Sequence, residues 1–199
     1  MIVEQDFLRR ILPFGTNSEQ EFLVAHNTTP VKDKQWITPA GKLVKEWISG
    51  VVLNRRPAIE DARGELVEVY NPAWNLHPDP MVYVYQASVR PGKVKGWVVH
   101  HKQDDRLYTM VGVLRWVLFD NRPESPSYKM INDITVSEHN RALLIVPKGV
   151  FHAVKNIGTS DAYFINMPTK AYDHTDPDKH RLPVKNDLIP FDFDDESKW

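Results

Sequence analysis

The stretch Pro147-Lys148-Gly149-Val150-Phe151-His152-Ala153-Val154-Lys155-Asn156 decides the fold of this chain. Its proline and glycine, two residues apart, predict a tight turn, because proline fixes φ and glycine tolerates φ above zero. The apolar runs 142–146 and 150–154 on either side of the turn predict two strands. The turn therefore places His152 on the second strand of a hairpin, among apolar neighbours.

Composition limits the classes of function. A chain of 199 residues with 42% apolar residues can bury one substantial core. Its net charge of −1 gives no field that would attract nucleic acid or an anionic membrane surface. The chain has no cysteine, which excludes disulfides, thiolate nucleophiles and cysteine-based metal sites. It shows no signal-peptide pattern and no run of roughly 20 apolar residues, so we expect a cytoplasmic protein.

The first 60 residues differ in pattern from the rest. Short helices are predicted over 5–12 and 18–24. A longer helix is predicted over 38–50, where threonine followed by proline resembles an N-cap with proline at the first helical position, and a glycine follows as a stop. We therefore expect residues 1–60 to form a helical N-terminal extension and residues 61–199 to form a β-barrel domain with a C-terminal tail.

After this region the apolar pattern changes to a period of two, as in strands. Turns rich in proline, glycine, asparagine, aspartate and serine separate the segments. Short strands at this spacing predict an all-β barrel or a double-sheet jelly roll. The predicted strands cover residues 66–70, 81–89, 94–101, 107–119, 130–136, 142–146, 150–156 and 162–166.

The hairpin and a segment upstream of it resemble the two signature motifs of the cupin superfamily. The hairpin reads P-x-G-x-x-H-x-x-x-N and matches that motif throughout. Residues 92–112 resemble G-x5-H-x-H-x(3,4)-E-x6-G, with Val98 in place of the first histidine and Asp105 in place of the glutamate. Alternate residues of a strand share a face, so His100 points the same way as Val98. The resemblance implies a double-stranded β-helix (the cupin jelly roll) in which His100, Asp105 and His152 converge on the cavity.

Among cupins, residues from 64 to about 193 resemble the dTDP-4-dehydrorhamnose 3,5-epimerase family. The resemblance rests on R-G-E-L-V-E at 63–68, V-K-G-W at 94–97, V-L-F-D-N-R at 117–122, S-P-S-Y at 125–128 and P-T-x-x-Y at 168–172. It implies a nucleotide-linked 4-keto sugar as substrate and a reaction without a metal. In this family a histidine removes the proton beside the ketone, a tyrosine returns a proton to the opposite face, and a lysine helps to stabilise the enolate.

The chain departs from the family at the positions that carry this chemistry. Val98 stands at the base position and cannot accept a proton. The lysine position falls near Asp105, and the acid tyrosine position falls near Asn166. His100 resembles the second histidine of the H-x-H pair in the related sugar 3,4-ketoisomerases. We therefore expect His100 to be the acid–base residue, supported by Asp105 and His152.

Further candidates surround the mouth of the expected cavity. Tyr83 and Tyr85 share a strand face and could stack on a base or sugar ring, or one of them could partner His100 in the proton transfer. Arg90 and Lys95 could pair with a diphosphate. The full set of ligand-binding candidates is Tyr83, Tyr85, Arg90, Lys95, Lys102, Asn166 and Tyr172, the last of which matches a family tyrosine that packs near the nucleotide base.

Three functions stay open on the sequence alone. The first is an epimerase or isomerase that acts on a nucleotide-linked 4-keto-6-deoxy sugar without a cofactor. The second, suggested by Val98 and Asn166, is a catalytically inactive protein that binds a sugar nucleotide. The third is a metal-dependent cupin, because His100, Asp105 and His152 supply two imidazoles and a carboxylate. The family resemblance also implies a homodimer. We expect no nucleic-acid or membrane partner.

Overall fold

The computed structural model describes residues 32–195 of the chain. The chain divides into two compact units, residues 1–45 and 46–199, and every named element of the described residues lies in the second unit. The helices predicted over 5–12 and 18–24 lie outside the described residues.

The helix predicted over 38–50 is wrong. In its place the chain makes a tight turn in which the amide of Gly41 donates to the carbonyl of Thr38 at 2.9 Å. Proline at the second position of a turn and glycine at the fourth are typical of a β-turn, and Gly41 has φ of +76°. The threonine–proline pair that resembles a helix start therefore begins a turn. The described part of residues 1–60 contains no helix.

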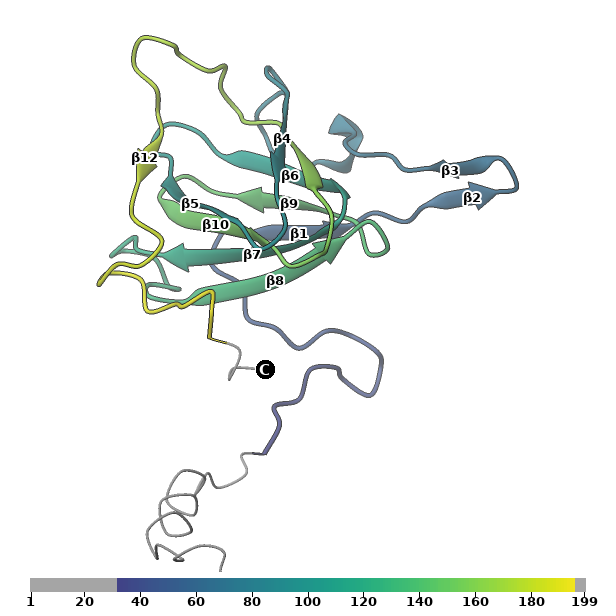
Figure 1. Ribbon diagram of the computed structural model, residues 1–199, viewed down its shortest axis with the longest axis horizontal. Coiled ribbons are helices and arrows are strands. Elements are labelled where there is room, and N and C mark those ends of the chain that lie inside the picture. Colours follow the sequence, from purple (N-terminus) through teal and green to yellow (C-terminus); the bar gives the residue numbers. More distant parts are fainter. Residues whose placement is uncertain (1–31, 196–199) are drawn as a thin grey trace, which may run out of the picture. The chain divides into compact units, whose positions relative to one another are not determined.

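Residues 46–199 form two five-stranded antiparallel sheets that face each other, with a separate two-stranded hairpin (Figure 1). The first sheet has the order β1 (Val52–Arg55), β9 (Ala142–Val146), β6 (Asp105–Val111), β11 (Ala162–Asn166) and β4 (Tyr85–Val89). The second has the order β12 (His180–Arg181), β5 (Val94–Val99), β10 (Val150–Asn156), β7 (Val113–Asp120) and β8 (Ile131–Ser137). The hairpin pairs β2 (Ile59–Asp61) with β3 (Gly64–Leu66), and one short 3-10 helix, η1, spans Pro72–Trp74.

This arrangement confirms the predicted all-β, cupin-type fold. The strands predicted over 142–146, 150–156 and 162–166 match β9, β10 and β11 residue for residue. The barrel starts earlier than predicted, because β1 already belongs to its first sheet. The strand predicted over 66–70 is wrong, because β3 ends at Leu66.

The strand predicted over 107–119 is two strands. β6 ends before Gly112 and β7 begins after it, and these strands belong to different sheets. Gly112 has φ of +86°, and a Cβ added there would lie 2.6 Å from the Cβ of Ala162. Only glycine fits this corner without displacing its neighbour. The continuous apolar pattern on both sides of Gly112 conceals the change of sheet.

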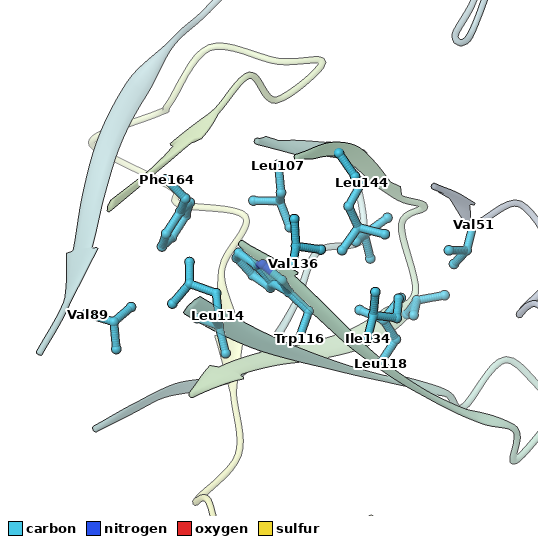
Figure 2. Close-up of a cluster of buried hydrophobic side chains, with 14 of the residues drawn as sticks. Val51, Val89, Leu107, Leu114, Trp116, Leu118, Ile134, Val136, Leu144 and Phe164 are labelled. Carbon is cyan, nitrogen blue, oxygen red and sulfur yellow. The ribbon is translucent and has the colours of Figure 1, made fainter. Parts of the chain in front are cut away.

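The main core fills the space between the two sheets (Figure 2). Trp116 of β7 packs edge-to-face against Phe164 of β11, with ring centroids 5.0 Å apart. Leu114 and Leu118, on the same face of β7, are fully buried. Burying each such side chain stabilises the fold by about 1.5–3 kcal/mol. The sheets are thus held together by the strands whose inward faces also form the site.

Chain segments cover the outer faces of both sheets. Residues 67–76 pack on Tyr108, Leu143 and Ile145 of the first sheet. On the second sheet, Trp97 lies against the C-terminal segment, with its ring centroid 5.6 Å from that of Phe193. Before it reaches this face, the chain passes along two cavities of the barrel and pairs briefly with β5 as residues 172–181, which we call the C-terminal strap.

Candidate functional site

Two imidazoles converge on one carboxylate inside the barrel. His100 Nε2 lies 3.3 Å from Asp105 Oδ2, and His152 Nε2 lies 3.4 Å from the same oxygen. The two imidazole centroids are 5.6 Å apart. All three residues are buried, with exposed fractions of 7%, 2% and 8%. The predicted convergence of His100 and His152 in a common cavity is confirmed.

The strand register explains this convergence. β10 runs antiparallel to β5 and places His152 directly opposite Val98. His100 follows the end of β5, two residues after Val98, and Asp105 is the first residue of β6. The turn of the hairpin motif has φ of +81° at Gly149, whose amide donates to the carbonyl of His100 at 2.7 Å. The two sequence motifs are therefore hydrogen-bonded to each other.

Backbone carbonyls orient the imidazoles. His100 Nδ1 contacts the carbonyl oxygen of Asp178, which belongs to the C-terminal strap. His152 Nδ1 lies 3.4 Å from the carbonyl oxygen of Val150. The carbonyl of Asp178 and the carboxylate of Asp105 only accept hydrogen bonds, so together they favour a His100 ring with protons on both Nδ1 and Nε2. When Nε2 loses its proton, the neutral ring keeps the proton on Nδ1. The Nε2 atoms of both rings are thereby directed to Asp105.

The charges of the cluster support one another. Burial alone would raise the pKa of Asp105, but hydrogen bonds from His100 and His152 outweigh it and hold the pKa well below its ordinary value. Burial lowers the pKa of His100, but the carboxylate of Asp105 and the carbonyl of Asp178 more than offset this and raise it. Asp105 is therefore ionised, and it makes His100 a stronger base than a free histidine.

An inner cavity of about 390 Å³ adjoins this cluster. Its walls include Tyr85 and Asn166, the apolar core residue Trp116, and Lys95, so the inner cavity contacts several predicted ligand-binding residues. Lys179 and Arg181 from the C-terminal strap also line this cavity, although no pattern in the sequence indicated them.

Three cations line this cavity. Among residues 32–195, no carboxylate forms an ion pair with Lys95, Lys179 or Arg181. Burial, together with the positive charges of Arg181 and Lys95, lowers the pKa of Lys179. Cations that lack a protein counter-ion favour an anionic ligand.

An outer cavity of about 570 Å³ lies beside the inner one and shares Tyr85, His100 and Lys179 with it. Its aromatic lining comprises Tyr83 and Tyr85, with ring centroids 5.7 Å apart, and Tyr172. Aromatic faces of this kind can stack on a planar base or a sugar ring.

Of two further predicted residues, one lines a cavity and the other does not. Lys102 lines the outer cavity and pairs with Asp176 at 2.8 Å. Arg90 lines neither cavity and lies exposed in the turn between β4 and β5. The structure thus brings every predicted site residue except Arg90 to a cavity wall.

Asp178 is the site residue that sequence reasoning missed most completely. Its carboxylate accepts hydrogen bonds from the backbone amides of His101 and Lys102, at 2.9 Å and 2.6 Å. Its carbonyl contacts His100, which is 78 residues earlier in the chain. The only sequence signal was the richness of the tail in aspartate, histidine and proline, which does not show where the tail lies.

His100, Asp105 and His152 could also hold a divalent metal. Their ligand atoms all lie within 4.8 Å of one another, and two imidazoles with a carboxylate suit such an ion. Val98 lines the same cavity, where its side chain offers no ligand atom. The cluster therefore provides three protein ligands.

Comparison with known proteins identifies the family. The family model for dTDP-4-dehydrorhamnose 3,5-epimerase matches residues 45–187. The chain belongs to this family. It is 33% identical over 137 residues to the probable low-salt glycan biosynthesis epimerase Agl13 of Haloferax volcanii, covering 68% of this chain and 88% of that protein. It is 30% identical over 152 residues to the spore coat polysaccharide biosynthesis protein SpsL of Bacillus subtilis, covering 75% of this chain and 98% of that protein.

Solved structures of family members share the fold. A dTDP sugar isomerase from Desulfovibrio desulfuricans superposes with a TM-score of 0.68 at 23% identity, covering 73% of this chain and 91% of that one. The dTDP-4-dehydrorhamnose 3,5-epimerase of Bacillus anthracis gives a TM-score of 0.66 at 18% identity, covering 75% and 88%. The predicted resemblance to this epimerase family is confirmed.

Proposed function

We propose that this protein is an epimerase that acts on a nucleotide-linked 4-keto-6-deoxy sugar. The observation that carries the proposal is the convergence of His100 and His152 on Asp105, beside a cavity, in a chain of this family. The relatives support it, since one is named as a glycan biosynthesis epimerase and a solved neighbour holds dTDP-4-keto-L-rhamnose.

The geometry fits proton removal beside a ketone. The ketone acidifies the adjacent C–H bond because the electron pair left behind delocalises onto the ketone oxygen. A neutral His100 accepts that proton, and the carboxylate of Asp105 stabilises the imidazolium that forms. His152 contacts the same carboxylate oxygen and helps to fix its position. A base of this kind works best with a pKa near neutrality.

The cations and aromatic rings give the ligand its orientation in this proposal. Lys95, Lys179 and Arg181 would pair with the diphosphate, and Tyr83 and Tyr172 would contact the nucleotide in the outer cavity. Guanidinium and ammonium groups both bind phosphate oxygens, and aromatic faces stack on bases.

The test is solvent exchange. The purified protein is incubated with dTDP-4-keto-6-deoxyglucose in deuterated water, and deuterium uptake beside the ketone is followed by mass spectrometry and NMR. We expect uptake in the wild type and a loss of about 10²–10⁴-fold in His100→Ala. His139→Ala is the matched control, because His139 is exposed in a turn. Absence of uptake with this and other keto-sugar nucleotides would overturn the proposal, and binding without uptake would favour an inactive binding protein.

We further propose that the reaction needs no metal, because an imidazole and a carboxylate suffice for proton removal from a carbon beside a ketone. Elemental analysis and activity after dialysis against a chelator test this. Full activity without stoichiometric metal is expected. A loss that Mn²⁺, Fe²⁺ or Zn²⁺ restores would instead assign the three residues to a metal-dependent cupin.

A homodimer is part of the proposal. Ile59 and Leu66 lie opposite each other on the hairpin β2–β3, which extends away from the sheets (Figure 1), with exposed fractions of 70% and 58%. Val82 and Val84, just before the edge strand β4, are also about half exposed. A second copy would cover these apolar side chains. Sedimentation should give twice the 23.0 kDa chain mass, and Ile59→Lys with Leu66→Lys should give the monomer.

No helix among the described residues has the length and apolar character to cross a membrane. The cytoplasmic location stays a prediction.

A further inference from the structure

The proposed epimerisation needs a second proton-transfer group. If one base removes a proton and returns it to the same face, the starting sugar is restored. Inversion therefore requires an acid on the opposite face of the same carbon. The two histidines project from the second sheet, on β10 and at the end of β5. An acid that faces them would have to come from the first sheet.

Tyr85 occupies such a position. It begins β4 in the first sheet, and its register partner is Asn166 on β11. The side chains of this pair meet as well, because Asn166 Nδ2 donates to Tyr85 Oη at 2.9 Å. Tyr85 lines both cavities, together with His100. Tyr83, the other tyrosine on this face, lines only the outer cavity.

The hydrogen-bond pattern leaves the phenolic proton available. Asn166 occupies an acceptor position of the hydroxyl oxygen, and among residues 32–195 no acceptor takes the hydroxyl hydrogen of Tyr85. Burial, with a further contribution from the negative charge of Asp105, raises the pKa of Tyr85 to about 12. The phenol is thus protonated at neutral pH, as an acid must be before it acts.

Asn166 gives an independent sign that a ligand belongs between these groups. It is 1% exposed and lines the inner cavity, yet its Oδ1 has no hydrogen-bond partner among the described residues. A buried carbonyl oxygen without a donor destabilises the fold, because it has lost its hydrogen bonds to water. A hydroxyl of a bound sugar would supply that donor.

We propose that Tyr85, held by Asn166, delivers the proton to the face of the sugar opposite His100. In the reaction the C–H bond beside the ketone breaks, its proton goes to His100 Nε2, and its electron pair moves onto the ketone oxygen. The electron pair then returns from the oxygen to the carbon, which restores the ketone, and forms a new C–H bond with the proton of Tyr85 Oη as the O–H bond breaks. The amide of Asn166 stabilises the phenolate, which regains a proton from solvent while His100 releases one. This inference rests on the proposed function and names its acid.

The experiment separates exchange from inversion. With dTDP-4-keto-6-deoxyglucose in deuterated water, Tyr85→Phe should still exchange the hydrogen beside the ketone, because His100 is intact. Formation of the epimer should fall by about 10²–10⁴-fold. Tyr163→Phe is the matched control, since Tyr163 is on β11 of the same sheet and lines neither cavity. It should retain both exchange and inversion.

Inversion at the wild-type rate in Tyr85→Phe would overturn the inference while leaving the proposed function intact. Absence of exchange in the wild type would instead defeat the proposed function. Asn166→Ala keeps the tyrosine and serves as a second variant if Tyr85→Phe folds poorly. Its ratio of inversion to exchange should fall, because the phenolate loses its donor, and an unchanged ratio would contradict the role given to the pair.

Discussion

Two regions line the same cavity but differ in how they are held in place. They are the barrel wall, which consists of the strands of the two facing sheets with the residues beside them, and the C-terminal strap. His100, Asp105 and His152 on the wall are at most 8% exposed and lie on or beside strands of the two facing sheets. The strap is exposed over most of its length, and it reaches the barrel through the short pairing of β12 with β5 and the contacts of Asp178. Packed strands hold reacting groups in fixed positions, whereas an exposed segment can adapt to a ligand.

Both regions nevertheless contact the imidazole ring of His100. His100 receives the carboxylate of Asp105 from the wall and the carbonyl of Asp178 from the strap. The wall therefore supplies the charge that makes His100 basic, and the strap supplies the contact that fixes its tautomer. When a group is removed from one region, the activity that remains therefore measures what the other region contributes.

The largest effect is expected from Asp105→Asn. The amide keeps the shape of the side chain but removes the only carboxylate that contacts both imidazoles in the described structure. The imidazolium formed on proton removal then lacks its counter-charge, so kcat for solvent exchange should fall by about 10²–10⁴-fold. Asp161→Asn, an exposed substitution in a turn, is the control. Wild-type exchange in Asp105→Asn would show that the wall carboxylate has no catalytic role.

The sequence predicts the wall far better than the strap, for a physical reason. The strands β9, β10 and β11 are short apolar runs bounded by turn residues, and the hairpin motif fixes where His152 lies. The strap has no period that could be interpreted, because β12 contains only two residues and its place depends on pairing with the distant β5. The turn at Thr38 shows the opposite error, since its local signal fits a helix start equally well.

The next largest effect is expected from the strap cations. Arg181→Ala and Lys179→Ala each remove a cation that has no acidic partner among the described residues and lines the inner cavity. Each should weaken dTDP binding by roughly tenfold, which corresponds to about 1.4 kcal/mol. Isothermal titration calorimetry at two salt concentrations measures this. Arg90→Ala should bind dTDP as the wild type does, because Arg90 lines neither cavity. If Arg90→Ala weakened dTDP binding and the two strap variants did not, the diphosphate would bind at the β4–β5 turn and not at the strap.

A smaller effect is expected from Asp178→Ala. This change removes the carboxylate that accepts from the amides of His101 and Lys102, and so loosens the carbonyl that holds His100. We expect kcat to fall by about tenfold, which corresponds to roughly 1.4 kcal/mol in the barrier. Because that carbonyl contributes to the raised pKa of His100, the rise of kcat with pH should shift to lower pH.

Asp187→Ala, in the same C-terminal segment and exposed, is the control for Asp178→Ala. A loss of activity with no shift of the pH profile would mean that the strap only stabilises the fold. In that case the barrel wall alone would determine the basicity of His100.

The smallest effect expected is on the pH dependence of stability. Burial lowers the pKa of His100, but Asp105 from β6 and Asp178 from the strap raise it by more. A raised folded-state pKa contributes stability that is fully present below the unfolded pKa of about 6.5 and is lost as pH rises through the folded value. The wild type should therefore lose free energy of unfolding above about pH 6.5 relative to His100→Gln, as measured by urea titration at several pH values.

The same measurement on other variants tells the two regions apart. His139→Gln should keep the wild-type dependence of the free energy of unfolding on pH, because the side chain of His139 is exposed and its ion-pair partner is Glu138. If Asp105→Asn loses this dependence and Asp178→Ala keeps it, the wall carboxylate alone raises the pKa of His100. If both variants lose it, the strap carbonyl contributes as well. If the free energy of unfolding of His100→Gln depended on pH as that of the wild type does, the ion pair between His100 and Asp105 would add nothing to stability. It would then act in catalysis alone.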